Sequence, residues 1–207
     1  MDEILKITCA DSIRIMHPLF QMGDSGAIPT SAPQIKARDL TFEQCPKAHA
    51  VALVREWHSR LPNCQIGPWT HAFHGRHGDK TYVVALWNSP SGRCLPSNWR
   101  ELRRMACSPD APKNTPSRFL AWMVRWFKAN EPLCPHLISY QDTSVHSGTI
   151  YKAAGWLPEV TTVERVRDRS GLRAGTNRKY RWNVNGEEPD SVSKVRWGLD
   201  VSQYKPA

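Results

Sequence analysis

The order of patterns between residues 114 and 156 constrains the fold most strongly. Residues 115–131 carry apolar side chains at helical spacing, and a short apolar run follows at His136–Tyr140. A polar segment, 141–146, leads into a second short helical pattern at 147–154, which Gly155 stops. This order predicts an α/β (α+β) fold that can place a helix N-terminus and a strand-end acid around one ligand.

The first of these helices is predicted in detail. Thr115 can cap it, Pro116 opens it, and Glu131-Pro132 marks its end. Its broad apolar face consists of Phe119, Leu120, Trp122, Met123, Trp126 and Phe127.

The segments before residue 114 are less uniform. Helical spacing within Thr41–Arg60 predicts an amphipathic helix that ends before Pro62. The segment Trp69–Trp87 favours a hairpin or two adjacent strands. The segment Asn98–Cys107 fits a helix about as well as a strand, and periodicity leaves both open.

The two ends of the chain are expected to lie outside the main domain. Residues 1–40 are interpreted as an extension with a short strand at Ser12–Met16, residues 41–185 as the domain, and residues 186–207 as a polar, irregular tail. A last strand of the domain is predicted at Lys179–Val184.

Charge and cysteine usage limit the class of protein. Twenty-eight Lys and Arg face 19 Asp and Glu, for a formal charge of +9, which favours nucleic acid or anionic cofactors, although a solvated basic surface has a comparable claim. The six cysteines are widely spaced and are read as reduced thiols. No leader and no membrane-length apolar run is seen, so we expect a soluble, cytoplasmic protein without membrane contact.

Two segments could carry chemistry. The turn that precedes the helix, with Lys113 and Arg118, suits a phosphate at a helix N-terminus, although ordinary capping explains it equally well. Asp142 follows a strand and lies in a loop with His146, where it could be a general base or a metal ligand, or simply a turn residue.

Histidines and aromatics are weaker signals. His71, His74 and His77 point to alternating faces if the segment is a strand, which disfavours a metal cluster. His58 closes the first helix, where the helix dipole favours a cation. The aromatic residues Trp69, Tyr151 and Trp156 could stack on a base or fill the core, and two arginine clusters, 93–104 and 165–181, could follow phosphates.

Several of these pieces together resemble one superfamily. RELRRMAC, NTPS at a helix start, SYQD and GTIYKAAGW are similar to the acyltransferases related to Gcn5 (GNAT), in the branch of the phage Mom DNA-modification proteins. The resemblance covers about residues 41–160 and implies a central mixed, mostly antiparallel sheet flanked by helices. It also implies that RELRRMAC is the central strand. The loop DAPKNTPS differs from the superfamily's loop because it contains no glycine.

The resemblance also implies a function. Mom proteins add a carbamoylmethyl group to N6 of adenine in double-stranded phage DNA, which protects the DNA from restriction. The donor would be acetyl-CoA or another acyl or glycyl donor, and the host cytoplasm would be the place of action. The residues that would hold the donor are Arg103, Arg104, Lys113, Asn114, Thr115, Ser117 and Arg118. The implied catalytic residues are Asp142, Tyr151, which would line the acceptor pocket, and Ser139; iron would be held by His58 and Asp142.

Two other functions stay open on the sequence. The chain could be a conventional acetyl-CoA-dependent N-acetyltransferase acting on a protein or a small amine. It could also be a non-catalytic binding protein with the same fold. A homodimer is compatible with each of these functions.

Overall fold

The computed structural model describes residues 35–58, 64, 67, 69–92, 94–162 and 193–205. The predicted strands Ser12–Met16 and Lys179–Val184 and the arginine cluster 165–181 lie outside these residues. The helix expected in 41–60 is α1, Lys47–Trp57.

Seven strands of the described chain form one sheet, in the order β1-β2-β3-β4-β5-β7-β6. All neighbouring pairs are antiparallel except β4 and β5. The strand bounds are β1 Thr41–Gln44, β2 His71–His77, β3 Lys80–Asn88, β4 Arg100–Cys107, β5 His136–Asp142, β6 Leu157–Thr162 and β7 Lys194–Asp200. The mixed, mostly antiparallel sheet that we expected is confirmed, and the ambiguous segment at 98–107 is a strand.

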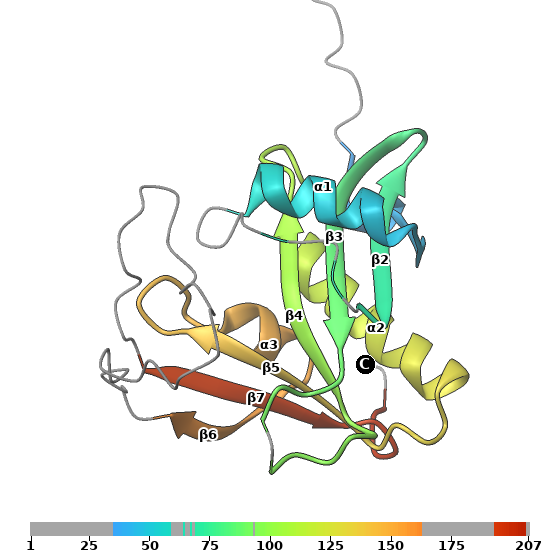
Figure 1. Cartoon of the computed structure of the whole chain (residues 1–207). Helices are drawn as coiled ribbons and strands as arrows, with labels where there is room; N and C mark the ends of the chain where they lie inside the picture. The colour runs from blue at the N-terminus through green and yellow to red at the C-terminus, as the bar shows by residue number, and fades with distance from the viewer. Residues whose placement is uncertain are drawn as a thin grey trace, which may run out of the picture. The chain divides into compact units, whose positions relative to one another are not determined.

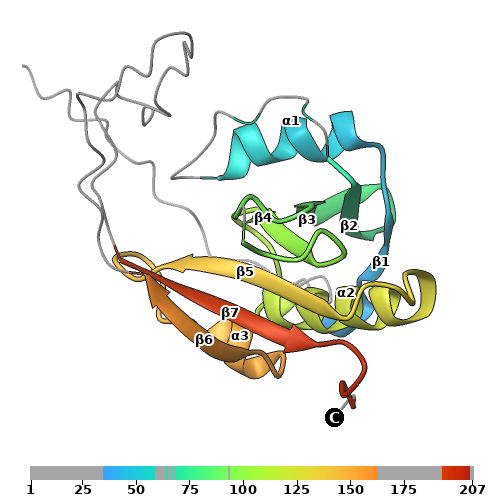
Figure 2. The same ribbon diagram turned by 60° about the horizontal axis from the view of Figure 1, so that its bottom comes forward.

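Helices cover both faces of the sheet. A single 3-10 turn, η1 (Ala37–Asp39), precedes β1. Helix α1 packs on β2, β3 and β4 through its buried residues Ala50, Val51 and Val54. Helices α2 (Thr115–Asn130) and α3 (Thr149–Ala153) lie on the opposite face (Figures 1 and 2). We call these the α1 face and the α3 face.

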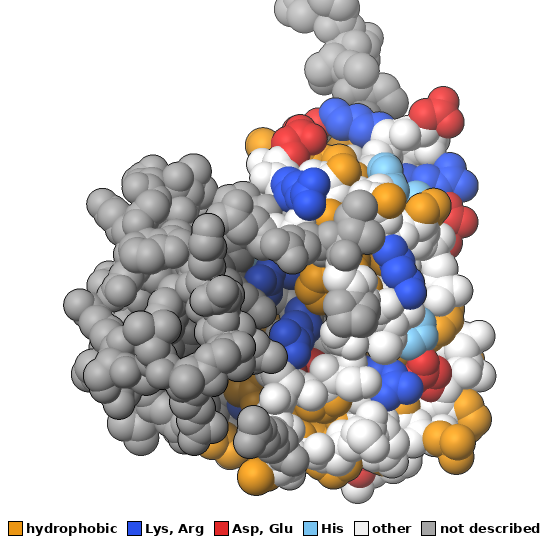
Figure 3. All heavy atoms as spheres, in the orientation of Figure 1, with side chains coloured by type: hydrophobic (Ala, Val, Ile, Leu, Met, Phe, Trp, Pro, Cys, Tyr) orange, Lys and Arg blue, Asp and Glu red, His pale blue; other side chains and the backbone are white. Residues whose placement is uncertain are grey.

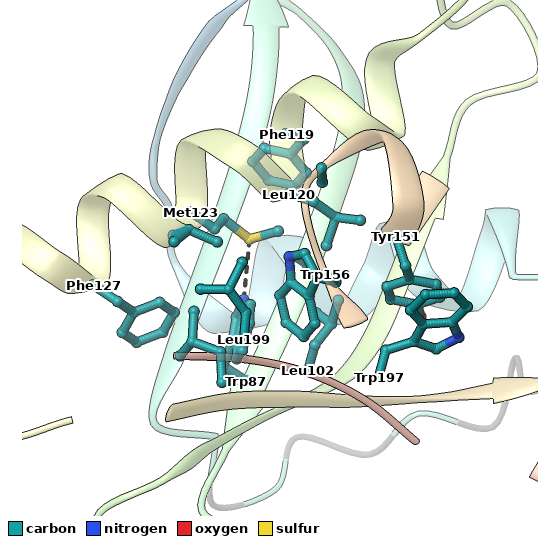
Figure 4. Close-up of a cluster of buried hydrophobic side chains, with 14 of the residues drawn as sticks. Trp87, Leu102, Phe119, Leu120, Met123, Phe127, Tyr151, Trp156, Trp197 and Leu199 are labelled. Carbon is teal, nitrogen blue, oxygen red and sulfur yellow. Dashed lines mark hydrogen bonds between the residues drawn. The ribbon is translucent and has the colours of Figure 1, made fainter. Parts of the chain in front are cut away.

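The main core lies between the sheet and α2, and it contains most of the large aromatic side chains. Phe119, Met123 and Phe127 of α2 are fully buried there, as the apolar face of the sequence indicated. The Trp87 Nε1–H donates to the Met123 sulfur at 3.0 Å (Figure 4). This bond satisfies the polar end of a tryptophan that is otherwise surrounded by apolar groups.

The expectation of an irregular tail is wrong for Lys194–Asp200. These residues form β7, which lies between β5 and β6 and pairs with both. The reason is a period-two pattern: Val195, Trp197 and Leu199 alternate toward the α3 face, where they join or pack against the main core. The intervening polar residues hid this pattern, and the edge strand β6 was missed because most of its side chains are exposed.

Among the described residues, none of the helices combines the length and hydrophobicity that a membrane crossing needs.

Candidate functional site

The site begins where β4 and β5 separate. Their parallel pairing covers only Arg100–Leu102 with Leu137–Ser139. Beyond Leu102 and Ser139 the two strands diverge: β4 runs toward α1, and β5 runs beside β7 (Figure 1). Because the strands are parallel, both of their carboxyl ends lie at the same edge of the sheet. The turn before α2 follows β4 and Asp142 ends β5, so each predicted segment follows the carboxyl end of one of these two strands.

A β-bulge in β4 lies at the point of divergence. Trp87 is paired with Leu102 and Leu86 with Arg104, so Arg103 is the extra residue. Its Nε lies 3.2 Å from Glu101 Oε1. Glu101 is 6% exposed and also accepts the backbone N–H of Ser91 at 2.9 Å. The ion pair therefore connects the bulge to the loop after β3.

A buried hydroxyl pair occupies the last rung of the β4–β5 ladder. Ser139 Oγ donates to the Leu102 carbonyl at 3.3 Å and lies 2.9 Å from Tyr151 Oη. Because the Ser139 proton points to Leu102, the Tyr151 hydroxyl donates to Ser139. Tyr151 also stacks on Trp197, with ring centroids 5.4 Å apart and planes inclined by 12° (Figure 4). The phenol is thus held in a fixed position beside the point where β4 and β5 separate.

Burial raises the pKa of Tyr151, an effect that the bond to Ser139 partly offsets. The phenol therefore keeps its proton through the physiological pH range.

The N-terminus of α2 differs from the expected capped end. The N-cap residue is Asn114, at φ +68° and without a side-chain capping bond. Thr115 is the first helical residue; it is fully buried, and its hydroxyl donates to Pro112 O at 2.7 Å. The prediction that Thr115 caps the helix is wrong. Asn114 takes the left-handed conformation that glycine usually supplies, which compensates locally for a loop without glycine.

This end of α2 suits an anion. Thr115 N–H donates to Pro112 O, Arg118 N–H donates to Asn114 O, and Pro116 has no N–H. Ser117 therefore supplies the first-turn N–H that can meet an anion, and the exposed side chains of Lys113 and Arg118 flank it. Ser117 is half-buried in the first turn, and its hydroxyl donates to Asn114 O at 3.1 Å. The residues present therefore fit the pyrophosphate of a coenzyme A-type donor.

Asp142 ends β5 and is organised by its own turn. Its Oδ1 accepts the Ser144 N–H at 3.0 Å and the Ser144 hydroxyl at 2.5 Å. In the ladder it lies opposite Lys194 of β7. The turn role and a chemical role are compatible, because the turn fixes the position of the carboxylate.

His58 lies at the C-cap of α1, and its surroundings contradict the helix-end cation interpretation. Burial, followed by the positive charge of Arg104 and then by His146, lowers the pKa of His58 to about 4. The ring is therefore neutral at pH 7. These three cationic or titratable side chains lie near one another although they come from α1, β4 and the loop after β5.

The neutral His58 predicts acid sensitivity. The unfolded chain binds a proton at its ordinary pKa of 6.5 and the folded chain only near pH 4, so stability rises with pH across this window. His58→Gln should remove about 1–2 kcal/mol of that pH dependence, allowing for solvent screening of a partly exposed ring. Urea unfolding at several pH values between 4 and 7 measures it, and equal slopes in both proteins would contradict the assignment.

The described residues do not fit a metal centre. No group of three His, Cys, Asp or Glu converges among them, whereas the usual non-haem iron site has two histidines and a carboxylate. The three histidines of β2 also separate: His71 pairs with Glu131 at 2.8 Å, His74 with Glu43 at 3.2 Å, and His77 bonds to Asp39 O. The described residues therefore do not support the predicted iron site of His58 and Asp142.

The other aromatic candidates are buried or partly buried. Trp156 is 2% exposed and Tyr151 8% exposed, both on the α3 face, so neither presents a ring to a base. Trp69 is partly buried against α1. Sequence reasoning missed Tyr140 and Arg196, because their shared face depends on the pairing of β5 with a strand that was not predicted.

The divergent parallel pair, the bulged β4 and the helix that follows it define the GNAT fold. The chain is similar to the ribosomal-protein-S18-alanine N-acetyltransferase from Escherichia coli, with TM-score 0.51, 12% identity, and 80% of this chain and 96% of that one covered. YncA from Salmonella typhimurium, a putative acetyltransferase solved with acetyl-CoA, gives TM-score 0.53 at 8% identity, with 81% and 97% covered. The ribosomal-protein-S5-alanine acetyltransferase from Vibrio fischeri gives 0.51 at 10%, with 81% and 96% covered.

At these identities the likeness concerns the fold. The family comparison is more specific: the model of the Mom protein family matches residues 39–188, and the chain belongs to this family. No curated protein sequence matches the chain.

Proposed function

We propose that this protein is a transferase that moves an acyl-derived, carbamoylmethyl-like group to N6 of adenine in double-stranded DNA and so protects the DNA from restriction. The observation that carries the proposal is the match of residues 39–188 to the Mom family on a GNAT fold. The net charge of +9 supports a polyanionic substrate.

An acyl-CoA donor is supported by two features of the chain. The uncapped N-terminus of α2, with Lys113 and Arg118, suits a pyrophosphate. A protein of similar fold, YncA, was solved with acetyl-CoA. When bound, a thioester donor would supply an activated carbonyl and a thiolate leaving group, so direct transfer would place an acyl group such as glycyl, the isomer of carbamoylmethyl, on N6.

Residues of the chain then accept and donate the protons of the reaction. Adenine N6 is a weak nucleophile because its lone pair is delocalised into the ring, so its proton must leave as the new bond forms. Asp142 is the base that we assign to this step, held by the Ser144 turn. Tyr151 is the acid that we assign to the leaving sulfur, since it keeps its hydroxyl proton beside the point where β4 and β5 separate.

The test of the function is the chemistry of the DNA. We expect that plasmid DNA from restriction-competent cells expressing the protein contains a mass-shifted deoxyadenosine in nuclease digests. Glycyl and carbamoylmethyl groups contain the same atoms, so fragmentation against both synthetic nucleosides must distinguish them. Only unmodified nucleosides, with folded protein and any phage-supplied helper present, would refute the proposal.

Asp142→Asn is expected to lower the yield of modified nucleoside about 100-fold or more, because the amide keeps the turn but cannot accept the proton. The chain offers a matched control at the other end of the sheet. Asp200 accepts Ser202 N–H at 2.9 Å and Ser202 Oγ–H at 2.6 Å in the same kind of turn. Asp200→Asn should therefore leave the yield unchanged. Equal yields from the two variants would remove Asp142 from the mechanism.

A conventional N-acetyltransferase is the second candidate, since two of the proteins of similar fold are ribosomal-protein alanine acetyltransferases by their names. Transfer of radiolabelled acetyl from acetyl-CoA to a peptide amine, with unmodified DNA, would favour it.

A further inference from the structure

The α1 face of β5 carries side chains that neither α2 nor α3 covers. Leu137, Ser139 and Gln141 point to the α3 face, where they contact the core, Tyr151 and Trp197. The β5–β7 register runs without a shift from His136 to Asp142. Tyr140 and Asp142 therefore point to the opposite, α1 face.

Three cationic side chains lie near Tyr140 on that face, and two of them pair with carboxylates. Arg196 lies directly opposite Tyr140 in the ladder, and its Nε donates to Glu159 Oε2 at 2.9 Å. The exposed Lys194 lies opposite Asp142. Arg103 and Tyr140 are the first residues past the last β4–β5 pair. Glu101 lies opposite Ile138 and so shares the face of Tyr140, and Arg103 forms an ion pair with Glu101 on that face. Figure 3 shows separate Lys and Arg side chains, among polar and hydrophobic ones, below α1 on the visible face of the molecule.

The Tyr140 ring itself is available. It is partly exposed, and in the part of the chain that the structure describes it has neither a ring partner nor a hydrogen-bond partner. An aromatic ring between guanidinium groups is the arrangement that binds a nucleobase by stacking and the neighbouring phosphates by charge. The buried aromatics Tyr151 and Trp156 cannot do this from the α3 face.

We propose that Tyr140, flanked by Arg103, Arg196 and Lys194, is the platform on which the extruded adenine of a DNA strand stacks. This inference rests on the proposed function and identifies how the acceptor base is held. Asp142 lies two residues further along the same face, about 7 Å from Tyr140 along the strand. A base stacked on Tyr140 therefore has its edge within reach of the Asp142 carboxylate.

The ring is tested by binding without any donor. The probe is a fluorescein-labelled duplex in which one adenine faces an abasic site, because this lowers the cost of extrusion. Tyr140→Ala should weaken binding about 10- to 100-fold in fluorescence anisotropy, and Tyr140→Phe or Tyr140→Trp should stay within about threefold of the wild type. Circular dichroism melting confirms that each variant folds. Equal affinity of Tyr140→Ala and wild type would overturn the platform.

The charges are tested by salt dependence. Lys194→Gln should reduce the slope of log affinity against log salt by about 1, for every DNA sequence. The matched control is Lys152→Gln, an exposed lysine on α3 at the opposite face. Equal slopes for the two variants would overturn the assignment of Lys194 to the DNA-binding site. Binding of adenosine monophosphate as tight as that of the duplex would also overturn the proposal, because the site would then take a free nucleotide.

The stacking platform and the proposed reaction can be refuted independently of each other. If Tyr140→Ala loses binding while wild-type protein leaves DNA unmodified, the platform stands and the proposed reaction is wrong. If wild-type protein modifies DNA and Tyr140→Ala binds and modifies it equally well, the platform alone is wrong.

Discussion

Replacing Tyr151 by phenylalanine is expected to lower the rate of group transfer about 100- to 10,000-fold, the range that one general acid contributes. The reason is local: the phenol is the buried proton donor at the last rung before β4 and β5 part. Phenylalanine keeps the stack on Trp197 and removes only the hydroxyl. The modified nucleoside formed per unit time in purified reactions measures the effect.

The fold should tolerate this change. Ser139 loses one partner but still donates to the Leu102 carbonyl, so the free energy of unfolding should fall by only about 1 kcal/mol. Tyr204→Phe, which removes a tyrosine hydroxyl outside the site, is the matched control and should keep the wild-type rate. A Tyr151→Phe protein as active as this control would show that the leaving group takes its proton elsewhere.

Replacing Gly148 by alanine is expected to lower the free energy of unfolding by about 2–5 kcal/mol, the sum of backbone strain and overpacking. Gly148 has φ +75°, which disfavours any side chain. A Cβ there would lie 2.5 Å from Trp197 Cζ2 and 2.7 Å from Gln141 Oε1. Trp197 donates to that same oxygen at 2.6 Å and stacks on Tyr151, so the substitution also moves the proposed acid.

The chain contains a control that separates the two causes. Gly155 has φ +79°, but a Cβ there meets nothing closer than Tyr204 Cε2 at 3.9 Å. Gly155→Ala should therefore cost only the strain, about 1–2 kcal/mol. Chemical denaturation of both variants measures the difference, and equal losses would mean that Trp197 moves aside freely.

The sequence determined the local elements with strong periodic signals. Helix α2 and strand β5 follow from apolar spacing, Pro116 and the break at Glu131, and the β2–β3 hairpin follows from its turn residues and β-formers. The segment Arg100–Cys107 was decided by resemblance, because a bulge disturbs its alternation and periodicity alone fitted both helix and strand. The same resemblance identified the family.

Only the tertiary structure decided which side chains meet. The neutral state of His58 depends on burial and on Arg104, 46 positions later in the sequence, and the Ser139–Tyr151 bond depends on α3 folding back over β5. The position of Tyr140 opposite Arg196 depends on a C-terminal strand inserted beside β5. These contacts join segments that are distant in sequence, and local propensity carries no information about such pairings, whereas periodicity records which face of one element is buried.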